Sequence, residues 1–140
     1  MQTNKELENL GLFGQNIGTI KHLIVEKPKI IYEGEMTRTA NIGAIAGKNT
    51  GLIQDVSIQD VNIDIEGNTL WGTVVGGLAG ENTGTIECCR VTGKIKGKIV
   101  GGLVGKNWAR GNESPGVIER SSYIGIVESN DCVGGLVGNN

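Results

Sequence analysis

A five-residue glycine-rich phrase occurs five times in this chain, at residues 10–14, 43–47, 76–80, 101–105 and 134–138. Its closing glycines lie 33 residues apart in three of the four intervals and 25 residues apart in the other. A period in this range is typical of repeat proteins, in which each unit buries its apolar face only against its neighbours. The chain is therefore expected to fold as a stack of similar units.

Each phrase is followed by a pattern of β-forming residues. An asparagine stands two residues after the closing glycine, and a glycine and then an isoleucine follow it. Positions three and five residues beyond the isoleucine are mostly apolar, as at Val56 and Ile58. Apolar residues that alternate with period two between glycines are typical of β-strands. A third short strand is predicted in each unit, around Ile30, Ile63, Ile95 and Ile126.

These elements predict an all-β fold. No unit contains a helical pattern long enough to cross back over a sheet, so parallel stacking of like strands on like strands is the simplest arrangement. We expect a right-handed parallel β-solenoid of about four coils with three short strands in each coil. Residues 1–9 form a polar lead-in, and the expected coils are residues 10–42, 43–75, 76–100 and 101–133, with a fifth beginning at 134–140.

The stack predicts two ladders of side chains, one apolar and one polar. The isoleucines are expected to form an interior ladder with a spacing of ~4.8 Å between coils; they are Ile20, Ile53, Ile86 and Ile118. The asparagines are expected to form a turn ladder, because asparagine tolerates left-handed backbone and stacked amides can hydrogen-bond; they are Asn16, Asn49, Asn82, Asn107 and Asn140. The alternative is that this second row binds a ligand. The paired glycines of the phrase predict a tight corner or the close approach of another backbone.

Composition excludes several classes of function. Glycine is in excess, with 24 of 140 residues, but without the three-residue period of collagen. A net charge of −2 with scattered lysines gives no basic stripe for nucleic acid. The apolar runs are too short for membrane insertion, and the N-terminus lacks the apolar region of a secretory signal.

Cysteine and histidine do not suggest a metal or catalytic centre. The three cysteines fit neither a metal-ligand spacing nor an even-numbered disulfide framework. Cys88 and Cys89 are adjacent on a predicted strand, so we expect them to face opposite sides, with Cys89 in the core. His22 is the only histidine and is expected to point outward into solvent. We therefore predict no metal ligands, no cofactor and no catalytic residues.

Three aspartates of the second unit are the strongest candidates in the sequence for an acid–base site. Asp55, Asp60 and Asp64 alternate along a predicted strand, and carboxylate pairs on β-helical faces act on polysaccharides in other proteins. The neighbouring units do not repeat these acids, which favours a solvated strand face.

The better binding candidates lie in two excursions from the regular repeat, at residues 67–71 and 108–115. Trp71, Trp108 and Arg110 fall in expected surface loops, where a tryptophan could stack on a sugar or dock on a protein. The alternative is that each tryptophan packs as a lid over its own coil, because exposed large aromatics are uncommon.

The repeated phrase resembles the GLUG motif, a short repeat named for its Gly-Leu-x-Gly sequence. Residues 76–86 match its core, residues 101–107 match its first half, and the resemblance extends from Leu10 to Asn140. The second and first units depart from it, with Ala44 and Leu10 where a glycine is typical. The resemblance implies bacterial surface or secreted proteins, including adhesin-like chains and immunoglobulin-A-cleaving zinc metallopeptidases, in which the repeats lie outside the catalytic domain.

These observations predict a non-catalytic structural or interaction module, a rigid spacer or adhesive segment of a longer exported protein at the cell wall or outside the cell. The alternatives are an accessory region of a secreted metallopeptidase and a carbohydrate-binding or polysaccharide-active β-helix. A host protein or a glycan is the expected kind of partner. Residue 140 follows the fifth phrase without a capping segment, so we also expect an open strand edge and end-to-end self-association.

Overall fold

The computed structural model describes residues 9–33, 39–66, 72–109, 111–112 and 114–140, and in these residues the chain is built from β-strands with no helix. The strands of the first two coils are β1 (Asn9–Leu10), β2 (Phe13–Asn16), β3 (Thr19–Glu26), β4 (Lys29–Glu33), β5 (Asn41–Gly43), β6 (Ala46–Asn49) and β7 (Leu52–Glu66). Those of the later coils are β8 (Val74–Gly76), β9 (Ala79–Asn82), β10 (Thr85–Glu87), β11 (Arg90–Gly101), β12 (Val104–Asn107), β13 (Val117–Glu119), β14 (Ser122–Gly134) and β15 (Val137–Asn139). None of the described segments could cross a membrane as a helix.

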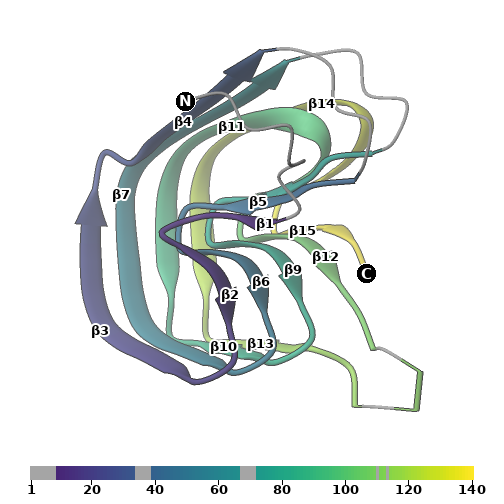
Figure 1. Ribbon diagram of the computed structural model, residues 1–140. Helices are drawn as coiled ribbons and strands as arrows, with labels where there is room; N and C mark the ends of the chain where they lie inside the picture. The colour runs from purple at the N-terminus through teal and green to yellow at the C-terminus, as the bar shows by residue number, and fades with distance from the viewer. Residues whose placement is uncertain (1–8, 34–38, 67–71, 110, 113) are drawn as a thin grey trace.

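The strands stack as a parallel β-solenoid of about four turns, which confirms the predicted fold. The short strands β2, β6, β9, β12 and β15 form one parallel sheet. The long strands β3, β7, β11 and β14 form a curved wall, with the chain folding back from it at the top and turning sharply at the phrase (Figure 1). Each coil therefore has an indented outline rather than a simple triangle.

The strands are longer than the three short segments predicted for each coil. In the second coil the second and third predicted strands are one strand, β7, and in the third coil β11 runs from Arg90 into the first glycine of the next phrase. The physical reason is that non-glycine residues with positive φ, such as Asp55 and Asp60, bend the chain without ending its coil-to-coil pairing. Bends of this kind in aspartate, histidine and cysteine leave no clear signal in the residue pattern.

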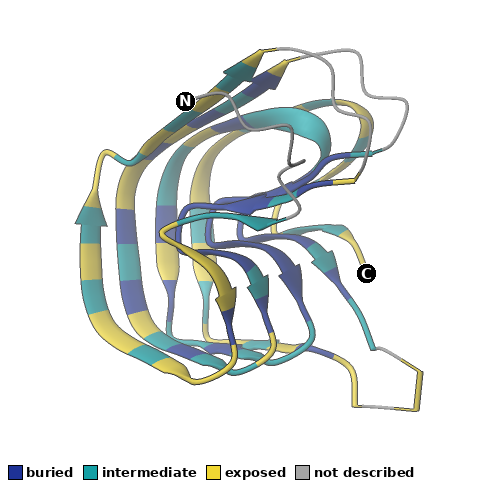
Figure 2. Cartoon of the chain, viewed as in Figure 1, coloured by how far each residue is buried: buried dark blue, intermediate teal, exposed yellow. Residues whose placement is uncertain are grey.

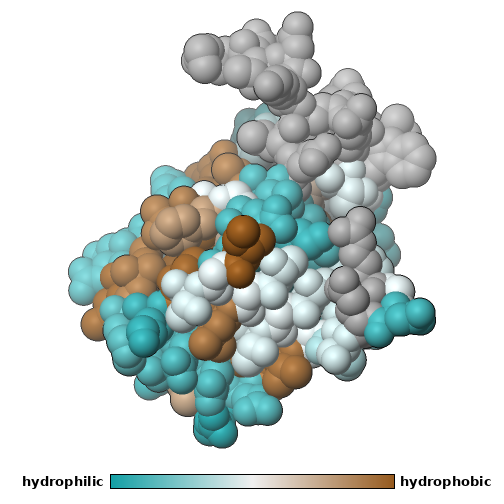
Figure 3. All heavy atoms as spheres, turned by 60° about the horizontal axis from the view of Figure 1, so that its bottom comes forward, coloured by the Kyte–Doolittle hydropathy of each residue, from teal (hydrophilic) through white to brown (hydrophobic). Residues whose placement is uncertain are grey.

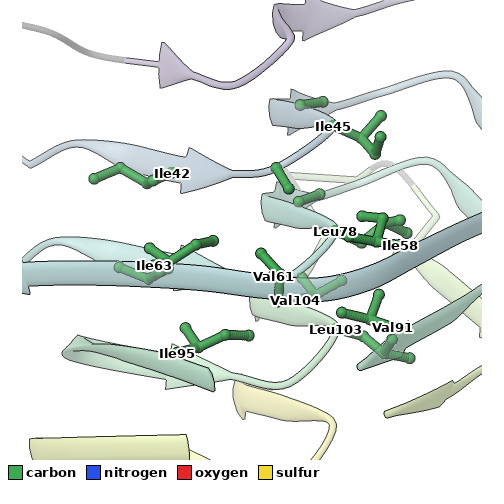
Figure 4. Close-up of a cluster of buried hydrophobic side chains, with 14 of the residues drawn as sticks. Ile42, Ile45, Ile58, Val61, Ile63, Leu78, Val91, Ile95, Leu103 and Val104 are labelled. Atoms are coloured by element: carbon green, nitrogen blue, oxygen red, sulfur yellow. The ribbon is translucent and has the colours of Figure 1, made fainter. Parts of the chain in front are cut away.

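The predicted isoleucine ladder is confirmed. Ile20 pairs with Ile53, Ile53 with Ile86, and Ile86 with Ile118, all in register between neighbouring coils. Ile53 and Ile86 are fully buried, whereas Ile20 and Ile118 are partly buried because they belong to the end coils. The core side chains of successive phrases, Ile45, Leu78 and Leu103, stack in the same way and face the curved wall (Figure 4).

Burial is concentrated in the middle of the stack (Figure 2). In the first coil Ile17, Ile24 and Ile31 are 80%, 66% and 53% exposed. Ile24 is in register with Ser57 and Ile31 with Asp64, so the next coil has polar residues at these outward positions. Apolar side chains also lie among hydrophilic ones on the face shown in Figure 3. The first coil thus carries apolar residues on its outward face.

Close approach of backbones explains the paired glycines of the third phrase, as the sequence predicted. A Cβ atom on Gly76 would collide with the carbonyl oxygen of Ala79, and one on Gly77 would collide with the carbonyl oxygen of Gly102. The closing glycines of the second to fifth phrases likewise pack directly against a strand of a neighbouring coil. A side chain at these positions would push the two backbones apart, so only glycine, which has no Cβ atom, fits there.

The glycine after each asparagine provides a matched pair of substitutions. A Cβ atom on Gly84 would collide with the carbonyl oxygen of Gly51 in the preceding coil, whereas one on Gly18 would meet nothing within 4 Å. We expect Gly84→Ala to lower the free energy of unfolding by about 1–3 kcal/mol through overpacking. Gly18→Ala, the same change in the first coil, should leave it nearly unchanged. Equal losses for the two variants in urea denaturation would contradict the stacking explanation.

Candidate functional site

The predicted asparagine ladder forms, and its hydrogen bonds all run in one direction. The side-chain nitrogen of each asparagine donates to the side-chain oxygen of the asparagine in the next coil. The donor–acceptor distances are 2.8 Å for Asn16 to Asn49, 2.8 Å for Asn49 to Asn82, 2.9 Å for Asn82 to Asn107 and 3.2 Å for Asn107 to Asn140. A chain of such bonds in the interior is expected to be mutually reinforcing.

The same amides also close the turns. Asn82 Nδ2 lies 3.2 Å from the carbonyl oxygen of Gly84, and Asn49 and Asn16 make the equivalent bond to Gly51 and Gly18. Asn49 and Asn82 have no exposed surface. The ladder atoms are thus occupied by the fold itself, which favours the turn role over the alternative of a ligand-binding row.

A column of outward-pointing corner residues has left-handed backbone. It consists of His22, Asp55, Cys88 and Arg120, with φ values of 57°, 53°, 53° and 46°. His22 Nδ1 lies 3.4 Å from Asp55 Oδ2, and Arg120 pairs with Glu87. His22 is exposed as predicted, at a bend of the coil. These pairs are partly solvated and lie on the outer wall.

The three aspartates of the second coil do not form an acid–base site. Asp55 pairs with His22, and the backbone nitrogen of Asp60 donates to Thr92 Oγ1 at 3.0 Å. Asp55 and Asp60 are exposed, as expected for a solvated face, and Asp64 is half-buried. The described residues contain no cluster of three or more histidines, cysteines, aspartates or glutamates that could hold a metal ion.

The cysteines are free thiols, and Cys89 is in the core as predicted. Cys88 and Cys89 lie between β10 and β11 rather than on one strand, because the backbone bends at Cys88. Burial raises the pKa of the Cys89 thiol to about 11. Its Sγ lies 3.3 Å from the carbonyl oxygen of Glu87, to which the thiol donates.

A row of charged side chains crosses the sheet of short strands. Lys48, Glu81 and Lys106 are in register on β6, β9 and β12, at the position before each ladder asparagine. Lys48 Nζ lies 3.3 Å from Glu81 Oε1, and the two side chains are only 17% and 11% exposed. The atoms are close but not aligned for a hydrogen bond, so Glu81 Oε1 is buried without a hydrogen-bond partner among the described residues.

Trp108 adjoins this row. The ammonium of Lys106 lies 4.4 Å from the centre of the Trp108 ring, a cation–π contact. Trp108 is half-buried, and its indole Nε1 is buried without a hydrogen-bond partner in the described part of the chain. The residue packs against its own coil, in agreement with the lid alternative. Trp71 and Arg110 lie outside the described residues.

An open hollow of about 390 Å³ lies over the charged row. One side is lined by Lys48, Glu81 and Lys106, and the other by Asn9, Asn41, Val74 and Thr39. Asn41 Nδ2 donates to Asn9 Oδ1 at 3.1 Å. The sequence interpretation missed this site, although one signal was present: charged residues precede the ladder asparagine in three successive units.

Comparison with protein-family models, with curated proteins and with solved structures gives no match. The resemblance to the GLUG motif therefore stays a prediction, and the structure of the site is interpreted from its own geometry.

The ladder makes a prediction for stability. Asn82→Ala removes the acceptor of Asn49 and the donor to Asn107, and it leaves buried polar groups unpaired. We expect a loss of about 1–3 kcal/mol in the free energy of unfolding. Asn62→Ala, at an exposed strand position, is the matched control and should change little. An unchanged melting temperature for Asn82→Ala would count against the ladder.

Cys89 predicts a dependence of stability on alkaline pH. Its thiol ionises near its ordinary pKa of 9.0 in the unfolded chain but only near 11 in the fold. Between these values the folded chain holds more protons than the unfolded chain, so the free energy of unfolding falls as pH rises. Cys89→Val should lose less stability than the natural chain between pH 9 and 11 in urea denaturation at each pH. An equal fall in the free energy of unfolding of both proteins over this pH range would show that Cys89 does not contribute to the pH dependence.

Proposed function

We propose that this chain is a non-catalytic structural and interaction module, a rigid spacer or adhesive segment of a larger exported bacterial protein. The observation that carries the proposal is the asparagine ladder, which connects the coils from Asn16 to Asn107 through buried hydrogen bonds and continues to Asn140 through a partly buried one. A continuous buried ladder resists bending between coils, because bending would separate donors from acceptors that have no water to replace them.

The distribution of charged groups supports the same function. The ion pairs Lys94–Glu128 and Lys96–Glu66 and the contact between His22 and Asp55 lie on the outer wall and are largely solvated. Such pairs contribute little individually, but they keep the wall polar along the stack. The placement outside the cell, in a longer protein, rests on the resemblance of the repeated phrase to the GLUG motif.

The direction of the ladder supports the end-to-end association expected from the sequence. Every ladder nitrogen donates toward the C-terminal coil, so two copies could continue the ladder only when they point the same way. Two copies would therefore associate head to tail rather than head to head. Head-to-tail contacts that do not close generate open chains of subunits.

Pairs of spin labels test the rigid-spacer function. Lys21, Gln54, Glu87 and Glu119 occupy one outward column in four successive coils. In a background of Cys88→Ser, Cys89→Val and Cys132→Ser, labels at Lys21→Cys and Glu119→Cys should give one narrow distance. It should exceed the Lys21→Cys to Glu87→Cys distance by roughly one coil spacing, ~5 Å.

The outcome is read by dipolar spectroscopy on frozen solutions. A broad distribution between the end coils would contradict a rigid spacer. The same samples at millimolar concentration should show an additional intermolecular distance if the chains associate head to tail, and its absence would contradict the association.

A further inference from the structure

The polar hollow has the features of a binding site that the repeat alone does not require. The fold needs the asparagine and the glycines at each turn, but the position before the asparagine varies from Gln15 in β2 to Asn139 in β15. In the middle coils this position holds Lys48, Glu81 and Lys106 instead. Burying a carboxylate and an ammonium is costly unless their hydrogen-bonding capacity is satisfied.

That capacity is not satisfied within the described residues. Glu81 is 8% exposed, and its Oε1 atom makes no hydrogen bond even though Lys48 Nζ is 3.3 Å away. Oε1 therefore needs a donor, and the ammonium of Lys48 has further N–H groups that need acceptors. A ligand that satisfies both must present a donor and an acceptor within a few atoms of each other.

The opposite wall of the hollow also offers both hydrogen-bond donors and acceptors. Asn41 donates to Asn9, and both amides, together with Thr39, line the hollow across from the charged row. Among the residues that the structure describes, Val74 is the one apolar residue of its lining. The volume of about 390 Å³ falls in the range of small-molecule sites, but the lining is too polar for an apolar ligand.

We propose that this hollow binds a neutral glycan, whose neighbouring hydroxyl groups bridge Glu81 and Lys48. A hydroxyl group is both donor and acceptor, so two adjacent hydroxyls complete the hydrogen bonds of the carboxylate and of the ammonium. The site goes beyond the proposed spacer function and does not depend on it.

A neutral ligand fits because the atom that lacks a partner is a carboxylate oxygen, Glu81 Oε1, which accepts from a hydroxyl group and repels an anionic group. Lys48 is paired with Glu81, and Lys106 lies over the Trp108 ring. An extended peptide strand fits less well, because strands add to a free sheet edge. Here β6, β9 and β12 cross the hollow with both edges already paired.

Titration followed by NMR tests the proposal. The ¹⁵N-labelled chain is titrated separately with cellotetraose, maltotetraose and tetra-N-acetylchitotetraose up to millimolar concentration. At least one of these probes should shift the backbone amide signals of Glu81, Lys106 and Asn41 in a saturable way. No shift at these residues with any of the three would overturn the proposal, and so would shifts confined to the loop around Asn112.

Two substitutions establish whether the carboxylate is responsible. Glu81→Gln keeps the shape but removes the charge, and we expect affinity for the bound probe to fall about tenfold, the effect of losing one charge-assisted hydrogen bond. Glu128→Gln, the same change on the outer wall, should bind as the natural chain does. Unchanged affinity in Glu81→Gln would overturn the assignment. If Glu81→Gln does not fold, Asn41→Ala on the opposite wall must weaken binding instead, and unchanged affinity there would overturn it equally.

Discussion

Direct contact between the backbones of neighbouring coils is the constraint on which this structure depends. The closing glycines lie so near the adjoining strand that a Cβ atom on Gly47 or Gly138 would come within 2.7 Å of its backbone. This contact brings the phrase into the interior and gives each coil its indented outline (Figure 1). It also fixes the register, because a shift by one residue would place a side chain where only glycine fits. The isoleucine and asparagine ladders follow from that register.

Much of the fold could be predicted because it repeats. Ile20, Ile53 and Ile86 each lie six residues after the closing glycine of a phrase, and Ile118 follows its phrase after an insertion. The sequence was therefore sufficient to align the coils, and the structure stacks these residues in register. The bends at His22, Asp55, Cys88 and Arg120 could not be predicted. Their left-handed backbone occurs in four different residue types, none of them glycine or asparagine, so composition gives no common signal. The sequence therefore predicted separate short strands where the structure has long curved ones.

The candidate site was less predictable than the fold. Sequence reasoning favoured tryptophans in the irregular loops, because loops carry function more often than regular strands do. The structure instead brings Lys48, Glu81 and Lys106 together within a regular sheet, opposite Asn9 and Asn41 from another part of the coil. The meeting of these two walls depends on the sharp turn at the phrase, whose geometry the sequence alone did not determine. Trp108 contributes through its ring, which the ammonium of Lys106 contacts.

Neighbouring coils are parallel and in register, with a directed ladder of asparagine amides between them. Nuclear Overhauser spectroscopy on the isotopically labelled chain tests this arrangement. We expect contacts between the side-chain amides of Asn49 and Asn82 and between the methyl groups of Ile53 and Ile86, each pair 33 residues apart in the sequence. Absence of these contacts, with Ile53 and Ile86 each contacting residues of antiparallel hairpin partners instead, would contradict it.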